Sequence, residues 1–211
     1  MIPGTAYGVL LNDRAELQAM ETRFTAKPYL ATPQAPIVYI KPRTCFTFGN
    51  GSVQIPRDVD QVVVSATLAL LFRTDTNRSG DNPEKSIGGV CLAADLSEPE
   101  SDYYRPAVRQ RCRDGFLPLG RFASFDMHTG QSDVVTLIDG KVEHRWSMER
   151  LVRPIAVLIG ALSEFMTLRA GDLLLVGLPG DAPRARPGQT VEIRSSGLPS
   201  IAARLEREST T

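Results

Sequence analysis

The most informative stretch of this chain reads Asp95-Leu-Ser-Glu-Pro-Glu, then Tyr103-Tyr104-Arg105-Pro106, then Arg111-Cys112-Arg113-Asp114-Gly115-Phe116-Leu117-Pro118-Leu119-Gly120. Arginines, tyrosines and acids alternate here with proline and glycine, which is more charge than a buried core requires. The stretch therefore predicts a functional or subunit-contacting segment between strands, and its neighbours in the chain are best interpreted from it.

The bulk composition bounds the class of protein. The chain has 211 residues, 42% of them hydrophobic, and a formal net charge of +0. These values predict one folded domain over residues 1–211, with a short N-terminal lid region at about 1–35 and a charged tail after 203. This net charge argues against a general polyanion binder, since nucleic acid requires a basic face, although charge can gather locally, as the arginines near 105–113 do. We expect no nucleic-acid partner.

Cysteine usage and hydropathy indicate the compartment. Cys45, Cys91 and Cys112 are an odd number without CxxC spacing, which favours reduced thiols in a cytoplasmic protein. No signal peptide is visible at the N-terminus, and no apolar run is long enough to cross a bilayer. We expect no membrane partner.

The hydrophobic pattern predicts an α+β fold, mainly β. The clearest strand signal is the aliphatic run Val62–Phe72, and Asp139-Gly140 joins two further strands in a hairpin because this pair tolerates positive φ. Asn12 or Asp13 is expected to cap a helix that ends at Phe24. Three further expectations are a short helix from Pro83 towards Cys91, a helix over Glu149–Phe165, and fraying after Ala203.

Four motifs in fixed order resemble the fumarylacetoacetate hydrolase family. They are Lys41-Pro42-Arg43-Thr44, the Asp95–Gly120 stretch, Met166-Thr167-Leu168-Arg169-Ala170-Gly171-Asp172 and Gly177-Leu178-Pro179. Within that family the chain is most similar to the N-terminal half of the isomerase/decarboxylases of homoprotocatechuate (4-hydroxyphenylacetate) catabolism. The resemblance implies a mixed β-sandwich roll with peripheral helices, and a family site that uses Mg²⁺ or Mn²⁺.

The resemblance also implies that the metal site is degenerate. The family's two metal-binding glutamates fall on Ser65 and Thr67, and Asp95 alone keeps a metal ligand's position, as a remnant. Two hydroxyls cannot neutralise a dication, and hard cations need converging carboxylate oxygens. We therefore expect this chain to bind no metal. Leu178 replaces the threonine that would bind a substrate carboxylate.

The family's lid carries an asparagine, a histidine and a glutamate. Asn12 matches the first, whereas the other two positions hold Glu16 and Ala19. The His–Glu pair that would activate water is thus absent. His128 and His144, the chain's only histidines, match no motif.

The resemblance suggests Lys41, Tyr104, Arg105, Arg111 and Asp114 as substrate-binding residues. Arg111 stands at a family lysine and offers a planar donor fork for a carboxylate, although it cannot exchange a proton. Other interpretations stay open: an ion pair at a strand end for Lys41, a turn cap for Asp114, and a solvated face or subunit contact for Arg105. No residue is predicted as catalytic.

The function implied by the resemblance is an N-terminal-type subunit of 2-hydroxyhepta-2,4-diene-1,7-dioate isomerase / 5-oxopent-3-ene-1,2,5-tricarboxylate decarboxylase. Its partners would be itself or a metal-bearing sister subunit, and a small di- or tricarboxylate. The isolated chain is then expected to have little activity. Two alternatives remain: a metal-free 2-oxo-acid isomerase or hydrolase acting alone, and a structural or regulatory protein that self-associates.

Overall fold

The computed structural model describes residues 4–76, 82–100, 105–126 and 132–209. Strands dominate these ranges, as the sequence predicted. In chain order the elements are β1 Ala6–Leu10, α1 Arg14–Phe24, β2 Ile37–Lys41, β3 Phe46–Phe48, β4 Ser52–Ile55, β5 Val62–Phe72, β6 Ile87–Ser97, α2 Val108–Arg111, β7 Leu117–Leu119, β8 Val134–Ile138, β9 Lys141–Trp146, α3 Ile155–Ser163, β10 Leu173–Leu175, β11 Arg184–Ala185, β12 Thr190–Ser195 and β13 Leu198–Arg207.

The larger sheet is curled. Among the described residues its strands pair in the order β2-β1-β10-β5-β6-β7-β3, with β11 beside β5. Laid flat, seven strands would hold the two end strands about 29 Å apart, because neighbouring strands lie ~4.8 Å apart. Yet Lys41 at the end of β2 and Phe46 at the start of β3 are five residues apart in the chain, a span of at most about 18 Å. The sheet must therefore bend until its two edges approach each other.

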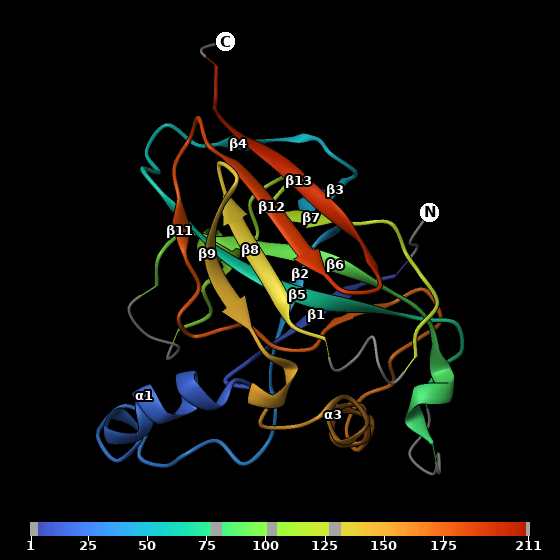
Figure 1. Cartoon of the computed structure of the whole chain (residues 1–211). Coiled ribbons are helices and arrows are strands. Elements are labelled where there is room, and N and C mark those ends of the chain that lie inside the picture. The colour runs from blue at the N-terminus through green and yellow to red at the C-terminus, as the bar shows by residue number, and fades with distance from the viewer. Residues whose placement is uncertain (1–3, 77–81, 101–104, 127–131, 210–211) are drawn as a thin grey trace.

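The second sheet, ordered β4-β13-β12-β8-β9, packs against the curled one (Figure 1). The main core cluster takes buried side chains from both sheets, among them Leu92 of β6 and Ile193 of β12. Gly120 allows close approach, since a Cβ there would lie 2.5 Å from a methyl group of Ile201. Both sheets mix parallel and antiparallel pairs, which confirms the expected mixed sandwich.

The helices lie at the periphery. Figure 1 shows α1 and α3 at one end of the molecule, below the strands. Asp13 caps α1 by accepting a hydrogen bond from the Glu16 amide at 3.2 Å, and Met20 and Phe24 form its buried face. In the described ranges no helix combines the length and the apolar character that crossing a bilayer would need.

Three local predictions need correction. Residues from Pro83 form one 3-10 turn over Pro83–Ser86 and then enter β6, so the expected helix towards Cys91 was wrong. The expected helix over Glu149–Phe165 is shorter: a 3-10 turn covers Met148–Arg150, and α3 begins only after Pro154. The segment after Ala203 does not fray, because β13 continues to Arg207 and pairs with β4.

Candidate functional site

The predicted metal position lies between β5 and β6. The two strands are antiparallel, and their register sets Ser65 directly opposite Asp95. All three predicted positions, Ser65, Thr67 and Asp95, are buried. The Thr67 hydroxyl donates to the Gly177 carbonyl at 2.7 Å, so it ties β5 to the following loop.

Asp95 is surrounded by donors of the protein itself. Its Oδ1 lies 2.7 Å from Lys41 Nζ, and its Oδ2 accepts a hydrogen bond from the Tyr39 hydroxyl. Arg111 Nη1 lies 3.9 Å from the same Oδ2. Both carboxylate oxygens therefore already face donors, and no second carboxylate stands at Ser65 or Thr67. The residues do not fit Mg²⁺ or Mn²⁺, which need several converging carboxylate oxygens.

Lys41 lies where the curled sheet closes. Its side chain is fully buried, and its Nζ donates to the carbonyls of Leu96 at 2.8 Å and Phe116 at 3.0 Å, besides pairing with Asp95. Two hydrogen bonds to backbone carbonyls and one ion pair therefore hold the ammonium group inside the protein. This geometry matches the ion-pair interpretation of Lys41, and the substrate-binding assignment of the residue stays a prediction.

Tyr39 holds its position because β1 makes room for it. Gly8 pairs with Tyr39 across β1 and β2, and a Cβ on Gly8 would overlap the Tyr39 ring. The Arg111 guanidinium carbon lies 4.9 Å from the centre of this ring, in a cation–π arrangement. Burial, followed by the charge of Asp95, raises the pKa of Tyr39 well above its ordinary value, so the phenol stays a donor.

Arg111 and Glu100 form the next layer. Arg111 Nε lies 2.8 Å from Glu100 Oε1, and each side chain is only 9% exposed. Burial raises the pKa of Glu100, while the charge of Arg111 opposes that rise. Arg111 therefore lies between two acids: Asp95 on one side and Glu100 on the other.

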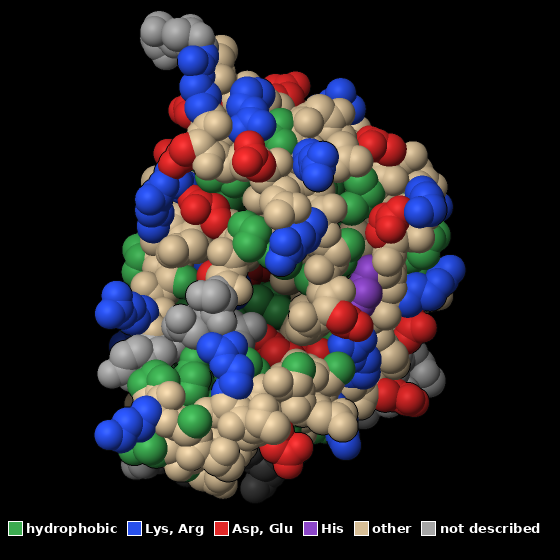
Figure 2. Space-filling view, turned by 90° about the vertical axis from the view of Figure 1, so that its left-hand side faces the viewer, with side chains coloured by type: hydrophobic (Ala, Val, Ile, Leu, Met, Phe, Trp, Pro, Cys, Tyr) green, Lys and Arg blue, Asp and Glu red, His purple; other side chains and the backbone are tan. Residues whose placement is uncertain are grey.

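Two cavities meet at the Arg111–Glu100 pair. The smaller one, of about 150 Å³, is lined by Ser65, Ser97, Glu16 and Arg184 besides the pair itself. The larger one, of about 550 Å³, runs along β2 and the 105–112 segment and is mainly apolar. Figure 2 shows a hollow near the middle of the face on which α1 and β11 lie, with acidic and hydrophobic side chains at its floor.

The lid residues have structural partners. Asn12 donates to the Val176 carbonyl at 2.7 Å and accepts from the Arg153 amide at 2.9 Å. Glu16, at the family's histidine position, lines the smaller cavity and accepts a hydrogen bond from the Leu11 amide at 2.9 Å.

A charge cluster anchors the start of α1. The buried Asp13 carboxylate pairs with Arg150 at 2.6 Å, and Arg150 also pairs with Asp181 at 2.8 Å. His144, on β9, lies 3.0 Å from Asp181 and lines neither cavity at the Arg111–Glu100 pair, whereas His128 lies outside the described residues.

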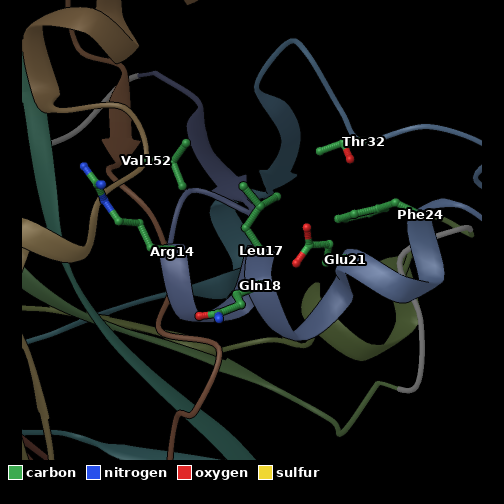
Figure 3. A pocket seen from close by; sticks show the side chains of 7 residues that line it. All are labelled: Arg14, Leu17, Gln18, Glu21, Phe24, Thr32 and Val152. Carbon is green, nitrogen blue, oxygen red and sulfur yellow. The ribbon is translucent and has the colours of Figure 1, made fainter.

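A third hollow lies between α1 and the segments that carry Thr32 and Val152, and its volume is about 390 Å³. Figure 3 shows the residues that line it. Among the predicted substrate residues that the structure describes, none lines it. Across the described ranges, no group of three or more His, Cys, Asp or Glu side chains is placed to hold a metal ion.

The predicted substrate residues do not converge on one point. Arg111 lines both cavities, and Arg105 lines only the larger one, where it is exposed. Asp114 is exposed in a turn before Gly115 and lines neither cavity. Tyr104 lies outside the described residues. All four assignments remain predictions.

Sequence reasoning missed Tyr39 and Glu100. Tyr39 stands two residues before Lys41 and therefore shares its face of β2, which was a usable signal. Glu100 follows the end of β6 in an irregular segment, and no period in the sequence shows where such a side chain points.

Fold and site together define a fumarylacetoacetate hydrolase-type domain. The sequence profile described as fumarylacetoacetate (FAA) hydrolase C-terminal matches residues 5–206, so the chain belongs to this family. It is 36% identical over 199 residues to the 4-hydroxyphenylacetate degradation bifunctional isomerase/decarboxylase of Salmonella dublin, covering 94% of this chain and 46% of that protein. The chain thus spans about half the length of this curated relative.

Two solved structures share the fold. A 5-carboxymethyl-2-hydroxymuconate delta-isomerase from Mycobacterium smegmatis superimposes with a TM-score of 0.83 at 24% identity, over 100% of this chain and 81% of that one. Fumarylpyruvate hydrolase from Pseudomonas aeruginosa, solved with Mn²⁺ and pyruvate, gives 0.80 at 17% identity, over 97% and 90%. The expected fold type is confirmed.

Proposed function

We propose that this chain is the N-terminal-type unit of a 2-hydroxyhepta-2,4-diene-1,7-dioate isomerase / 5-oxopent-3-ene-1,2,5-tricarboxylate decarboxylase of 4-hydroxyphenylacetate catabolism. The observation that carries the proposal is the 36% identity to the bifunctional isomerase/decarboxylase over 94% of the chain but only 46% of the relative. The chain then acts as a single domain in the cytoplasm, with a lid at about 1–35, and binds neither nucleic acid nor membrane.

In this proposal the chain binds no metal. Asp95 is held by Lys41 and Tyr39, and hydroxyls stand at Ser65 and Thr67. Decarboxylation of a 2-oxo acid develops negative charge on the 2-oxo oxygen, and a metal ion is an effective acceptor of that charge. The decarboxylation step therefore belongs to a metal-bearing sister unit, which this chain joins in one assembly.

The test uses association and turnover together. The chain is co-expressed with the other half of the Salmonella dublin relative, and light scattering measures the mass of the purified product. We expect a complex of the two, loss of tricarboxylate absorbance with the complex plus Mg²⁺, and little loss with the chain alone. A chain that stays monomeric beside the sister half, or that decarboxylates alone as fast as the complex, refutes the proposal.

A second candidate is a metal-free 2-oxo-acid isomerase or hydrolase that acts alone. The observation that favours it is the smaller cavity, which retains two basic side chains, Arg111 and Arg184. Turnover of a 2-oxo acid by the chain alone, in the presence of a chelator, would distinguish this candidate from a structural, self-associating protein.

A further inference from the structure

Helix α3 carries no charged residue on any side, although it lies at the periphery of the molecule (Figure 1). It spans nine residues, and four of them form the face that packs on the core: Ile155, Leu158, Ile159 and Leu162. A helix that is hydrophobic all round is normally buried all round, whereas a surface helix carries polar residues on its outer side. The outer side of α3 therefore has the composition of a surface that another protein covers.

The outer face of α3 is formed by Val157, Gly160 and Ala161, and Phe165 continues it one turn further. The Met166 amide donates to the carbonyl four residues earlier at 3.0 Å, so the helical geometry reaches Phe165. Val157, Ala161 and Phe165 follow at intervals of four residues and thus lie along one side. Val157 is 57% exposed and Phe165 is 60% exposed. Large apolar side chains gathered on one exposed face mark an interaction surface.

Gly160 stands in the middle of this face without a reason in the packing of the chain itself. A Cβ added there would have no neighbour within 4 Å beyond its own helix. Glycine inside a helix is less favourable than alanine, because glycine loses more conformational freedom on folding. The missing side chain does, however, leave space in which the side chain of a second helix can pack.

Two opposite charges flank the outer face. Arg153 stands just before α3, and Glu164 follows its last residue. Arg153 Nη2 donates to the Gln34 carbonyl at 2.6 Å, which holds the guanidinium near the start of the helix, and Glu164 is exposed. Because the positive charge is at one end of the helix and the negative charge at the other, the face is complementary to an antiparallel copy of itself.

We propose that two copies of this chain associate through the outer face of α3, with the two helices antiparallel about a two-fold axis. In a two-fold contact, each pair of facing residues occurs twice. The register that sets Arg153 opposite Glu164 of the second copy also sets Val157 opposite Gly160, where the valine fills the space that the glycine leaves. A parallel arrangement would set like charges opposite each other, which is unfavourable.

The contact is small. Nine helical residues span only about 14 Å, and a standard interface buries roughly 800 Å² on each partner. We therefore expect a dimer that dissociates on dilution. The inference does not rest on the proposed function, because it concerns a contact between copies of this chain and can be measured without the sister half.

Light scattering of the full chain over a dilution series measures the association, and we expect a concentration-dependent dimer. Val157→Glu should raise the dissociation constant on the order of tenfold or more, because it places a charge against apolar surface. Val142→Glu is the matched control, since Val142 is 44% exposed on β9, outside the proposed contact, and its dissociation constant should equal that of the wild type. Gly160→Leu has room in the single chain but would hold the second helix away, so it should also weaken the dimer. Circular dichroism checks that each variant is folded.

An exchange of charges tests the antiparallel register. Arg153→Glu and Glu164→Arg each set like charges opposite each other in their own homodimers, and each should weaken association. An equal mixture of these two variants should form heterodimers, because every contact then joins opposite charges.

Four outcomes overturn the inference: a wild type that stays monomeric at every concentration, equal dissociation constants for Val157→Glu and Val142→Glu, an unweakened dimer in Gly160→Leu, and a mixture of the two charge variants that associates no better than either alone. Complex formation with the sister half is measured separately and tests only the proposed function.

Discussion

Replacing Lys41 by methionine should remove the contact that closes the curled sheet. Lys41 Nζ, on β2, pairs with Asp95 of β6 at 2.7 Å, and both side chains are 0% exposed. Methionine keeps most of the apolar stem but removes the charge. The Asp95 carboxylate then stays buried with the Tyr39 hydroxyl and with Arg111, whose nearest nitrogen is 3.9 Å away.

The magnitude follows from burial. Removing one partner of a buried ion pair costs about 3–5 kcal/mol in the free energy of unfolding, because the remaining charge is left uncompensated. For a chain of this length that loss lowers the melting temperature by roughly 6–20 °C. The double variant Lys41→Met/Asp95→Asn removes both charges, and it should therefore be more stable than Lys41→Met alone.

Urea unfolding measures the effect, followed by circular dichroism and by fluorescence of the buried Trp146, the only tryptophan of the chain. The control is Lys141→Met, since Lys141 is 79% exposed in its pair with Glu143 and its loss should leave the melting temperature unchanged. A loss below about 1 kcal/mol in Lys41→Met, the size typical of a surface pair, would refute the idea that this contact closes the sheet.

Three further predictions follow. Gly8→Ala should displace the Tyr39 ring and lower the melting temperature; a crystal structure of the variant with Tyr39 unmoved would contradict this. Arg111→Ala should weaken dicarboxylate binding in calorimetry by about 1.5–3 kcal/mol, the value of a charge-assisted hydrogen bond, whereas Arg109→Ala, which breaks only an exposed pair, should not. Titration of the chain with Mg²⁺ or Mn²⁺ should show no stoichiometric micromolar binding, and such an isotherm would refute the degenerate-site interpretation.

The strands with a clear pattern were predictable. The run Val62–Phe72 was predicted with its observed bounds, and Asp139-Gly140 forms the expected hairpin with positive φ at both residues. β6 was not predicted, because its apolar residues run without alternation in a strand buried on both faces, and Pro83 nearby resembles a helix start. β13 beyond Ala203 was missed because charged residues on its exposed face resemble a frayed tail.

The site was less predictable than the fold. The resemblance identified Ser65, Thr67 and Asp95 as one site, and the register of β5 and β6 sets two of them opposite each other. The sequence left Lys41 between an ion pair and a ligand contact, since the distance from β2 to β6 depends on the curl of the whole sheet. Long-range closure of this kind has no local signal, whereas strand periodicity has one.

A bound metal ion would both compensate the charge of a buried carboxylate and supply chemistry at the site. In this chain a residue of the protein itself compensates that charge. A buried carboxylate whose counter-charge is a diffusible ion is uncompensated whenever the ion leaves, and that state is costly. Here the counter-charge of Asp95 belongs to Lys41, which is covalently part of β2, so the compensation is permanent and closes the sheet. Asp95 is thereby committed to stability. Arg111 faces both cavities beside Glu100, so the charged side chains that line the cavities differ from the pair that closes the sheet.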